Sequence, residues 1–268
     1  MSKSIKIDDI DMYHSRLALG HVDSTVQELD LLGILVERCS VQQQMDFIRN
    51  VYFITLSQFL LVSSMLALIL NVQPLSNWLE ESKYAWWIVL FPAFLFMIIA
   101  IWQLWTHYYQ LSQLTRIIIL VIYSFFMSFI LSELIAKVFY AYGLLVMTMV
   151  CFGILNTILY TFQTRFKFEG MKPIILSVAV ICISSVGLRK AYSLDPVQIL
   201  GPIALSCMIC SYLNLELYYA MKNMTVEDYI LANMSFHIDI IYPIHFIHHI
   251  SELFDSLDHI PEYFHPGI

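Results

Sequence analysis

The sequence predicts an all-α integral membrane protein, built as a bundle of seven transmembrane helices. The chain has 268 residues, of which 59% are hydrophobic and only 13% are charged, whereas soluble domains carry about 25% charged residues. Its mean hydropathy is +0.71. Three long stretches also contain no Asp, Glu, Lys or Arg. They run between Arg49 and Glu80, between Lys83 and Arg116, and between Lys137 and Arg165.

Charge and cysteine content exclude several classes of protein. The net charge is −7, so there is no basic surface of the kind that binds nucleic acid. The five cysteines are odd in number and four of them lie in apolar runs, which argues against a secreted disulfide framework. Cys207 and Cys210 form a CxxC pair inside an apolar helix with no second pair. Packing is therefore the better interpretation of these two thiols.

The chain divides into a cytoplasmic N-terminal segment (1–48), a transmembrane bundle (49–252) and a short polar C-terminal tail (253–268). A helix needs roughly 20 apolar residues to cross the hydrocarbon core. The predicted spans are 51–71, 86–106, 116–136, 140–163, 171–188, 197–221 and 229–250. The seventh is interrupted by polar residues and by Pro243, so it either crosses the membrane or re-enters it with a kink at the proline.

The N-terminal segment is expected to carry an amphipathic helix on the membrane surface. Thr25 and Glu28 resemble a capping box. Apolar residues then recur at helical spacing, at Leu29, Leu32, Val36 and Cys39. If the N-terminus is cytoplasmic, ten Lys and Arg residues lie on that side of the membrane and four on the other. The positive-inside rule favours this orientation.

Three carboxylates fall inside predicted spans, where a charge costs a few kcal/mol and is a functional hypothesis by default. Glu133 lies 17 residues after Arg116, near the far end of its span, and four residues before Lys137. That spacing predicts an i,i+4 ion pair at the membrane boundary.

Glu216 and Asp239 lie at overlapping depths in consecutive antiparallel helices, the sixth and seventh spans. Two carboxylates that share a dry site cannot both ionise cheaply, so they would titrate as a unit. Such a pair would sense pH, and when doubly ionised it would offer oxygen ligands to calcium. The polar residues expected to support it are Tyr212, Tyr219, Ser235 and Tyr242. The simpler alternative is two separate polar residues, each hydrogen-bonded within the bundle.

A histidine-rich run in the last helix raises the possibility of a zinc hydrolase. His245, His248, His249 and Glu252 form HxxHHxxE, in which His245 and His249 share a helical face. His107 would have to be the third ligand. It falls at the cytoplasmic end of the second span, whereas His245 and His249 fall toward the opposite side of the membrane in the seventh. We therefore expect no zinc, no other cofactor and no enzyme activity.

Four segments resemble the transmembrane Bax-inhibitor-motif family, in particular its lifeguard and Golgi anti-apoptotic branch. The similarity extends over residues 45–250 with order and spacing kept. The segments are DFIRNVYFITLSQFLL (46–61), YTFQTRFKFEGM (160–171), SYLNLELYYAM (211–221) and EDYILANMSFHIDIIYPIHFI (227–247).

This resemblance implies a seven-helix bundle of the endoplasmic reticulum or Golgi that leaks calcium from internal stores under pH control and suppresses cell death. It also implies that Glu216 and Asp239 correspond to the acidic pair of the family. The first position is usually aspartate there. Family members can also carry an arginine near the end of the second span, where the nearest basic group in this chain is His107. The alternative function is a non-conducting regulator that binds cell-death proteins through its N-terminal helix.

Overall fold

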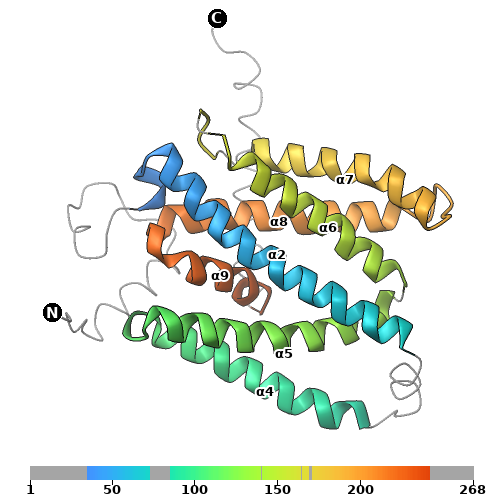
Figure 1. Cartoon of the computed structure of the whole chain (residues 1–268), viewed down its shortest axis with the longest axis horizontal. Coiled ribbons are helices and arrows are strands. Elements are labelled where there is room, and N and C mark those ends of the chain that lie inside the picture. Colours follow the sequence, from blue (N-terminus) through green and yellow to red (C-terminus); the bar gives the residue numbers. More distant parts are fainter. Residues whose placement is uncertain (1–34, 73–84, 140, 164, 169–170, 242–268) are drawn as a thin grey trace, which may run out of the picture.

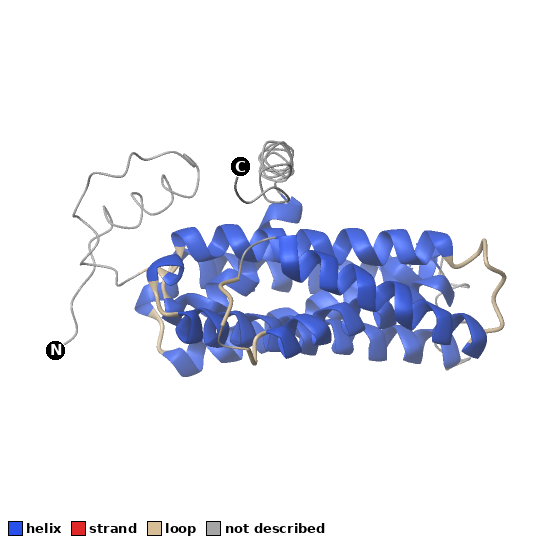
Figure 2. Cartoon of the chain, turned by 90° about the horizontal axis from the view of Figure 1, so that it is seen from above, coloured by secondary structure: helices blue, strands red, loops and turns tan. Residues whose placement is uncertain are grey.

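The computed structural model describes residues 35–72, 85–139, 141–163, 165–168 and 171–241, and these form an all-helical bundle without a strand. The seven α-helices of these residues run back and forth along one long axis (Figures 1 and 2). They are α2 (Val41–Asn71), α4 (Ala85–Thr106), α5 (Gln113–Phe139), α6 (Ala141–Tyr160), α7 (Met171–Ala191), α8 (Leu200–Asn223) and α9 (Tyr229–Ile241). The predicted all-α class is confirmed for this part of the chain.

Helix α2 begins ten residues before the predicted first span and crosses the expected domain boundary at residue 48. A capping box explains the early start. The Ser40 hydroxyl accepts a hydrogen bond from the Gln43 amide at 3.4 Å, and the Gln43 side chain accepts one from the Ser40 amide at 3.2 Å. Before this cap, Val36–Arg38 forms a single 3-10 turn, η2, that ends at Cys39. The expected amphipathic helix therefore does not run through Cys39, and its earlier residues lie outside the described part.

Five of the described helices are long and apolar enough to cross a membrane: α2, α5, α6, α7 and α8. Their bounds agree with five predicted spans to within a few residues, apart from the early start of α2. The second predicted span coincides with α4, whose apolar segment Leu90–Thr106 is shorter than these five. The α9 helix begins where predicted, at Tyr229. Its 13 residues cover about 20 Å, and the remainder of that span lies outside the described residues.

Helix α2 lies at the centre of the bundle and packs against α5, α6 and α9. On one side α6, α7 and α8 pack on one another, whereas α4 lies on the other side and packs on α5 (Figure 1). The α6–α8 contact is close at Gly153, where an added Cβ would come within 2.6 Å of the Cys210 sulfur. Cys210 is buried and donates to the Val150 carbonyl at 3.8 Å, so it serves in packing, as interpreted from the sequence.

The outer surface of the bundle is apolar. Large hydrophobic side chains are exposed on every spanning helix, including Phe53, Val121, Leu159, Ile183 and Met208, which are 49–73% exposed. A soluble monomer rarely exposes a continuous apolar surface of this kind. In a bilayer the same side chains contact lipid, so their exposure carries no free-energy penalty. Composition, helix length and surface therefore all point to a multi-pass membrane protein.

Candidate functional site

Glu216 lies on the inward face of α8 and is only 4% exposed. Its neighbours along the helix are apolar, and the buried stripe continues through Leu213, Leu217 and Ala220. The helix ends seven residues later at Asn223, so the carboxylate lies about 10 Å inside the end of the span. A carboxyl group at this depth is expensive to keep charged, which makes it the leading functional residue among those predicted.

One hydrogen bond that fixes the register between α8 and α9 is donated by the Tyr212 hydroxyl to the Phe236 carbonyl at 3.0 Å. Glu216 is four residues beyond Tyr212 in α8, and Asp239 is three residues beyond Phe236 in α9. Because the helices run antiparallel (Figure 1), the two acidic positions lie on opposite sides of this bond, about 10 Å apart along the axis. Helical side chains lean toward the N-terminus, which for Glu216 is toward Tyr212.

The acidic pair itself is not tested by the structure. The backbone of Asp239 belongs to α9, but its side chain lies outside the described residues, as does Tyr242 entirely. Ser235, expected to support the pair, donates to the Ala232 carbonyl of its own helix at 2.9 Å. His107 precedes a short 3-10 helix, η3 (Tyr108–Gln110), and its Nδ1 lies 2.7 Å from the Thr106 hydroxyl. It is exposed at the end of α4.

A buried polar cluster joins α2, α5 and α9, and sequence reasoning did not predict it. Its centre is a reciprocal amide pair. Gln58 Nε2 donates to Asn233 Oδ1 at 3.0 Å, and Asn233 Nδ2 donates to Gln58 Oε1 at 3.0 Å. The second proton of each amide is also used, by the Ser124 hydroxyl and the Thr55 hydroxyl, both at 3.0 Å. These four side chains are at most 9% exposed.

His237 extends the cluster by one more residue. Its Nε2 lies 3.3 Å from Gln58 Oε1. Since that oxygen can only accept, Nε2 is assigned the proton. The imidazole ring also lies against Tyr123 of α5, with ring centroids 5.4 Å apart. Thus one titratable group of α9 is held by α2 and α5 together, inside the bundle.

A second buried polar contact joins α2 to α8, two residues from Glu216. The Tyr52 hydroxyl donates to Asn214 Oδ1 at 2.9 Å, and Asn214 Nδ2 donates to the Cys210 carbonyl at 2.8 Å. Tyr52 and Asn214 are each 1% exposed. The inward polar side chains Tyr52, Thr55 and Gln58 recur every third residue of α2. That spacing could have indicated a polar inner face of α2 from the sequence. A second signal was Gln58 itself, the one amide side chain in the run 51–70.

A charged cluster lies outside the spans, at the end of the bundle where α2 begins. The turn η4 (Val226–Asp228) is capped by Asp228, whose Oδ2 accepts from the Thr225 amide at 3.2 Å and its hydroxyl at 2.7 Å. Burial raises the pKa of Asp228 above its ordinary value, while Thr225 and Arg116 act in the opposite direction. Arg116 stacks on the Tyr108 ring at 4.1 Å, and burial raises the pKa of Tyr108 to about 12.

The predicted ion pair at the opposite end is confirmed. Lys137 Nζ lies 3.2 Å from Glu133 Oε1, so this carboxylate is compensated within its own helix. Over the described ranges, no group of three or more His, Cys, Asp or Glu side chains could hold a metal ion. The histidines of HxxHHxxE and Glu252 lie outside those ranges, and the absence of zinc stays a prediction.

Comparisons with protein-family models, with curated proteins and with solved structures return no match for this chain.

Proposed function

We propose that this protein is a pH-sensitive calcium leak channel of an intracellular membrane, with Glu216 as a carboxyl group that controls the path. The observation that carries the proposal is the burial of Glu216, which is 4% exposed in an apolar spanning helix. A bilayer protein keeps an ionisable group at such a position at a cost of a few kcal/mol. Ion and proton pathways are the usual reason for that cost.

The chemistry expected of the site follows from its second acidic position. The Tyr212–Phe236 hydrogen bond holds α9 beside α8, so Asp239 lies on the helix next to that of Glu216. A proton held by either carboxyl group would neutralise one charge and weaken cation binding. Loss of that proton would restore two oxygen ligands for calcium. Conduction would then respond to pH in the mildly acidic to neutral range.

Other buried polar residues support an ion path through the bundle, of which Glu216 would be one part. Tyr52 and Asn214 lie on the α2 side of Glu216, and Gln58, Asn233 and His237 continue the polar interior toward α5. The four sequence segments similar to the Bax-inhibitor-motif family include both acidic positions, and that resemblance favours calcium leak and suppression of cell death in the endoplasmic reticulum or Golgi.

One observation favours the alternative, a non-conducting membrane regulator that acts through protein partners. All four amide protons of Gln58 and Asn233 are donated to side chains of the same cluster. A fully hydrogen-bonded network rigidifies a bundle and leaves those donors unavailable to water or ions. In this case the polar interior would hold the helices together and Glu216 would be one more structural group.

The deciding experiment is calcium flux from proteoliposomes between pH 5 and pH 8, using the full chain. The wild type should leak with a pH-dependent rate, and Glu216→Gln should flatten that dependence. The matched control is Glu133→Gln, which also removes a buried carboxylate from a span but one already paired with Lys137. This control should keep the wild-type profile. A wild type without flux above empty liposomes would contradict the channel and favour the regulator.

A further inference from the structure

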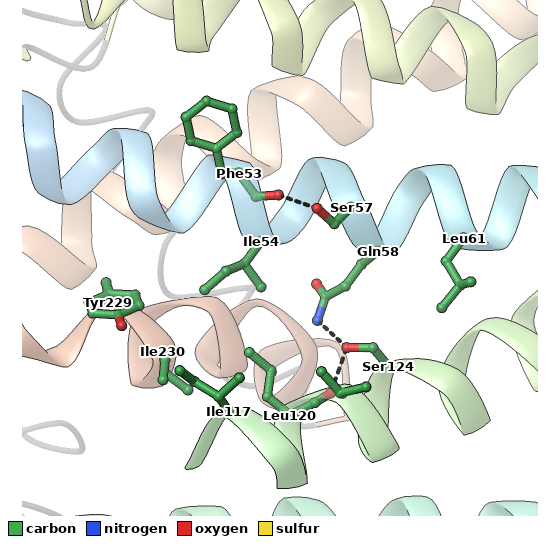
Figure 3. Close-up of a pocket in the computed structure, with 11 residues that line it drawn as sticks. Phe53, Ile54, Ser57, Gln58, Leu61, Ile117, Leu120, Ser124, Tyr229 and Ile230 are labelled. Atoms are coloured by element: carbon green, nitrogen blue, oxygen red, sulfur yellow. Dashed lines mark hydrogen bonds between the residues drawn. The ribbon is translucent and has the colours of Figure 1, made fainter. Parts of the chain in front are cut away.

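A groove runs along the outside of the bundle between α2 and α5, and the first residues of α9 close one of its ends (Figure 3). Its volume is about 390 Å³, within the size range of ligand sites. The groove is open to the lipid-facing surface, since Phe53 and Val121 on its rim are 49% and 61% exposed. The remaining walls include Ile54, Leu61 and Ile117.

The polar atoms on the floor of the groove are already satisfied. Gln58 and Ser124 line it, but Gln58 donates to Ser124 and Asn233, and Ser124 donates to the Leu120 carbonyl at 2.7 Å (Figure 3). The other lining residues are mostly apolar. The groove therefore offers van der Waals contact rather than free donors, and an apolar chain fits it better than a polar ligand does.

One end of the groove lies where the basic residues of the bundle are concentrated. Tyr229 lines this end, and its hydroxyl accepts from Gln113 Nε2 at 3.4 Å. Seven Lys and Arg residues of the described part lie at the end of the bundle where α2 begins, and three lie at the other. The seven are Arg38, Arg49, Arg116, Arg165, Lys167, Lys172 and Lys222, and the three are Lys137, Arg189 and Lys190.

Among the seven, Arg116 lies closest in sequence to the residues of α5 that line the groove, although it is not itself one of the lining residues. It lies one turn before Leu120, so it shares the face of α5 that lines the groove. The stack on Tyr108 at 4.1 Å and the hydrogen bond from Nε to the Leu111 carbonyl at 3.2 Å hold the guanidinium in place. The same guanidinium also interacts electrostatically with the carboxyl group of Asp228.

We propose that this groove binds one acyl chain of an anionic phospholipid, with the lipid phosphate on Arg116. The apolar walls suit the chain, and the planar guanidinium suits a phosphate at the membrane surface. A net negative headgroup is favoured over a zwitterionic one by the excess of basic residues at this end. Asp228, the nearby acid, is buried, and its Oδ2 already accepts from the Thr225 amide and hydroxyl.

Native mass spectrometry of the full-length protein would test this site. The protein is titrated with phosphatidylglycerol and with phosphatidylcholine of identical acyl chains. The wild type should prefer phosphatidylglycerol, and Arg116→Gln should reduce that preference roughly five-fold, the effect of one charge near an anionic headgroup. Arg165→Gln, an exposed arginine at the same end, should leave it unchanged. Equal losses in both variants would mean a diffuse surface attraction and would overturn the site.

A second pair of variants tests the groove without touching the charge. Val121→Trp fills it from the rim and should weaken binding of both lipids. Val186→Trp adds the same side chain to a valine of matching exposure on α7, 60% against 61%, and should have no effect. Both positions face lipid, so both variants should fold. If Val121→Trp binds lipid as the wild type does, the groove is not the site, whatever the arginine variants show.

Discussion

Gln58 and Asn233 are separated by 175 residues in sequence, yet their side-chain amides form two hydrogen bonds of 3.0 Å with each other. The pair joins the central helix α2 to the last described helix α9. It is one of several polar contacts that hold α9 in the bundle, together with the hydrogen bonds from Asn233 to Thr55 and from Tyr212 to the Phe236 carbonyl.

Removing one amide should destabilise the bundle, because the other is left with buried groups that have no partner. We expect Gln58→Leu or Asn233→Leu to lower the free energy of unfolding by about 1–2 kcal/mol. The double variant should lose less than the sum of the two. Unfolding in mixed micelles would measure this, with Gln103→Leu as a control at an exposed position of α4. Additive losses would mean that the amides act independently.

Glu216 and Asp239 should act as a unit in calcium binding and flux. If the titrations of the two carboxyl groups are coupled, Asp239→Asn should flatten the pH profile as Glu216→Gln does, and the double variant should add little to either. Radiolabelled calcium binding at pH 7.5 should fall in all three. A double variant that loses twice as much binding free energy as each single variant would show two separate sites.

The end of the bundle that carries seven basic residues should face the cytoplasm. Cysteines introduced at Lys167 and at Lys190, both exposed and at opposite ends, would report this in a background without the native cysteines. An impermeant maleimide added outside sealed microsomes should label position 167 and spare position 190. A protease added outside should also remove a tag placed before Met1. The reverse labelling pattern would invert the topology.

The stability of the folded protein should depend on the ionisation of Asp228. Burial raises its pKa above the ordinary value near 4, so the folded state holds this proton more tightly than the unfolded chain does. The protonated carboxyl therefore contributes stability below pH 4, and that contribution is lost as pH rises through the raised pKa. Asp228→Asn should be less sensitive to pH across this window in thermal unfolding. A wild type that gains stability there through this residue would contradict the assignment.

Protein purified without a histidine tag should contain far less than one zinc per chain. The reason is the expected depth: His107, the third ligand that the sequence offers, falls at the opposite side of the membrane from the positions predicted for His245 and His249. Elemental analysis would settle this point. Stoichiometric zinc that is lost on replacing His245 and His249 would instead make a membrane zinc hydrolase the leading function.

Most of the helices could be predicted from the chain because a bilayer constrains length and polarity together. A run of roughly 20 apolar residues must close its own hydrogen bonds, and five of the predicted spans accordingly match long apolar helices of the structure. The ion pair of Glu133 with Lys137 was also predictable, since both residues lie on one helix at a fixed spacing. The start of α2 was missed because Gln42–Gln44 reads as polar, although Ser40 and Gln43 form a cap.

What only the tertiary structure decided is which side chains face one another. Lipid and protein interior are both apolar, so periodicity does not show which face of a spanning helix is buried. Gln58, Ser124 and Asn233 come from three helices, and no local sequence pattern predicts that they are in contact. The sequence alone determined most of the described helices, their order and the position of Glu216 within α8. Packing determined its burial, the register of α8 against α9 through Tyr212, and the groove beside α2, because each of these depends on contacts between distant segments.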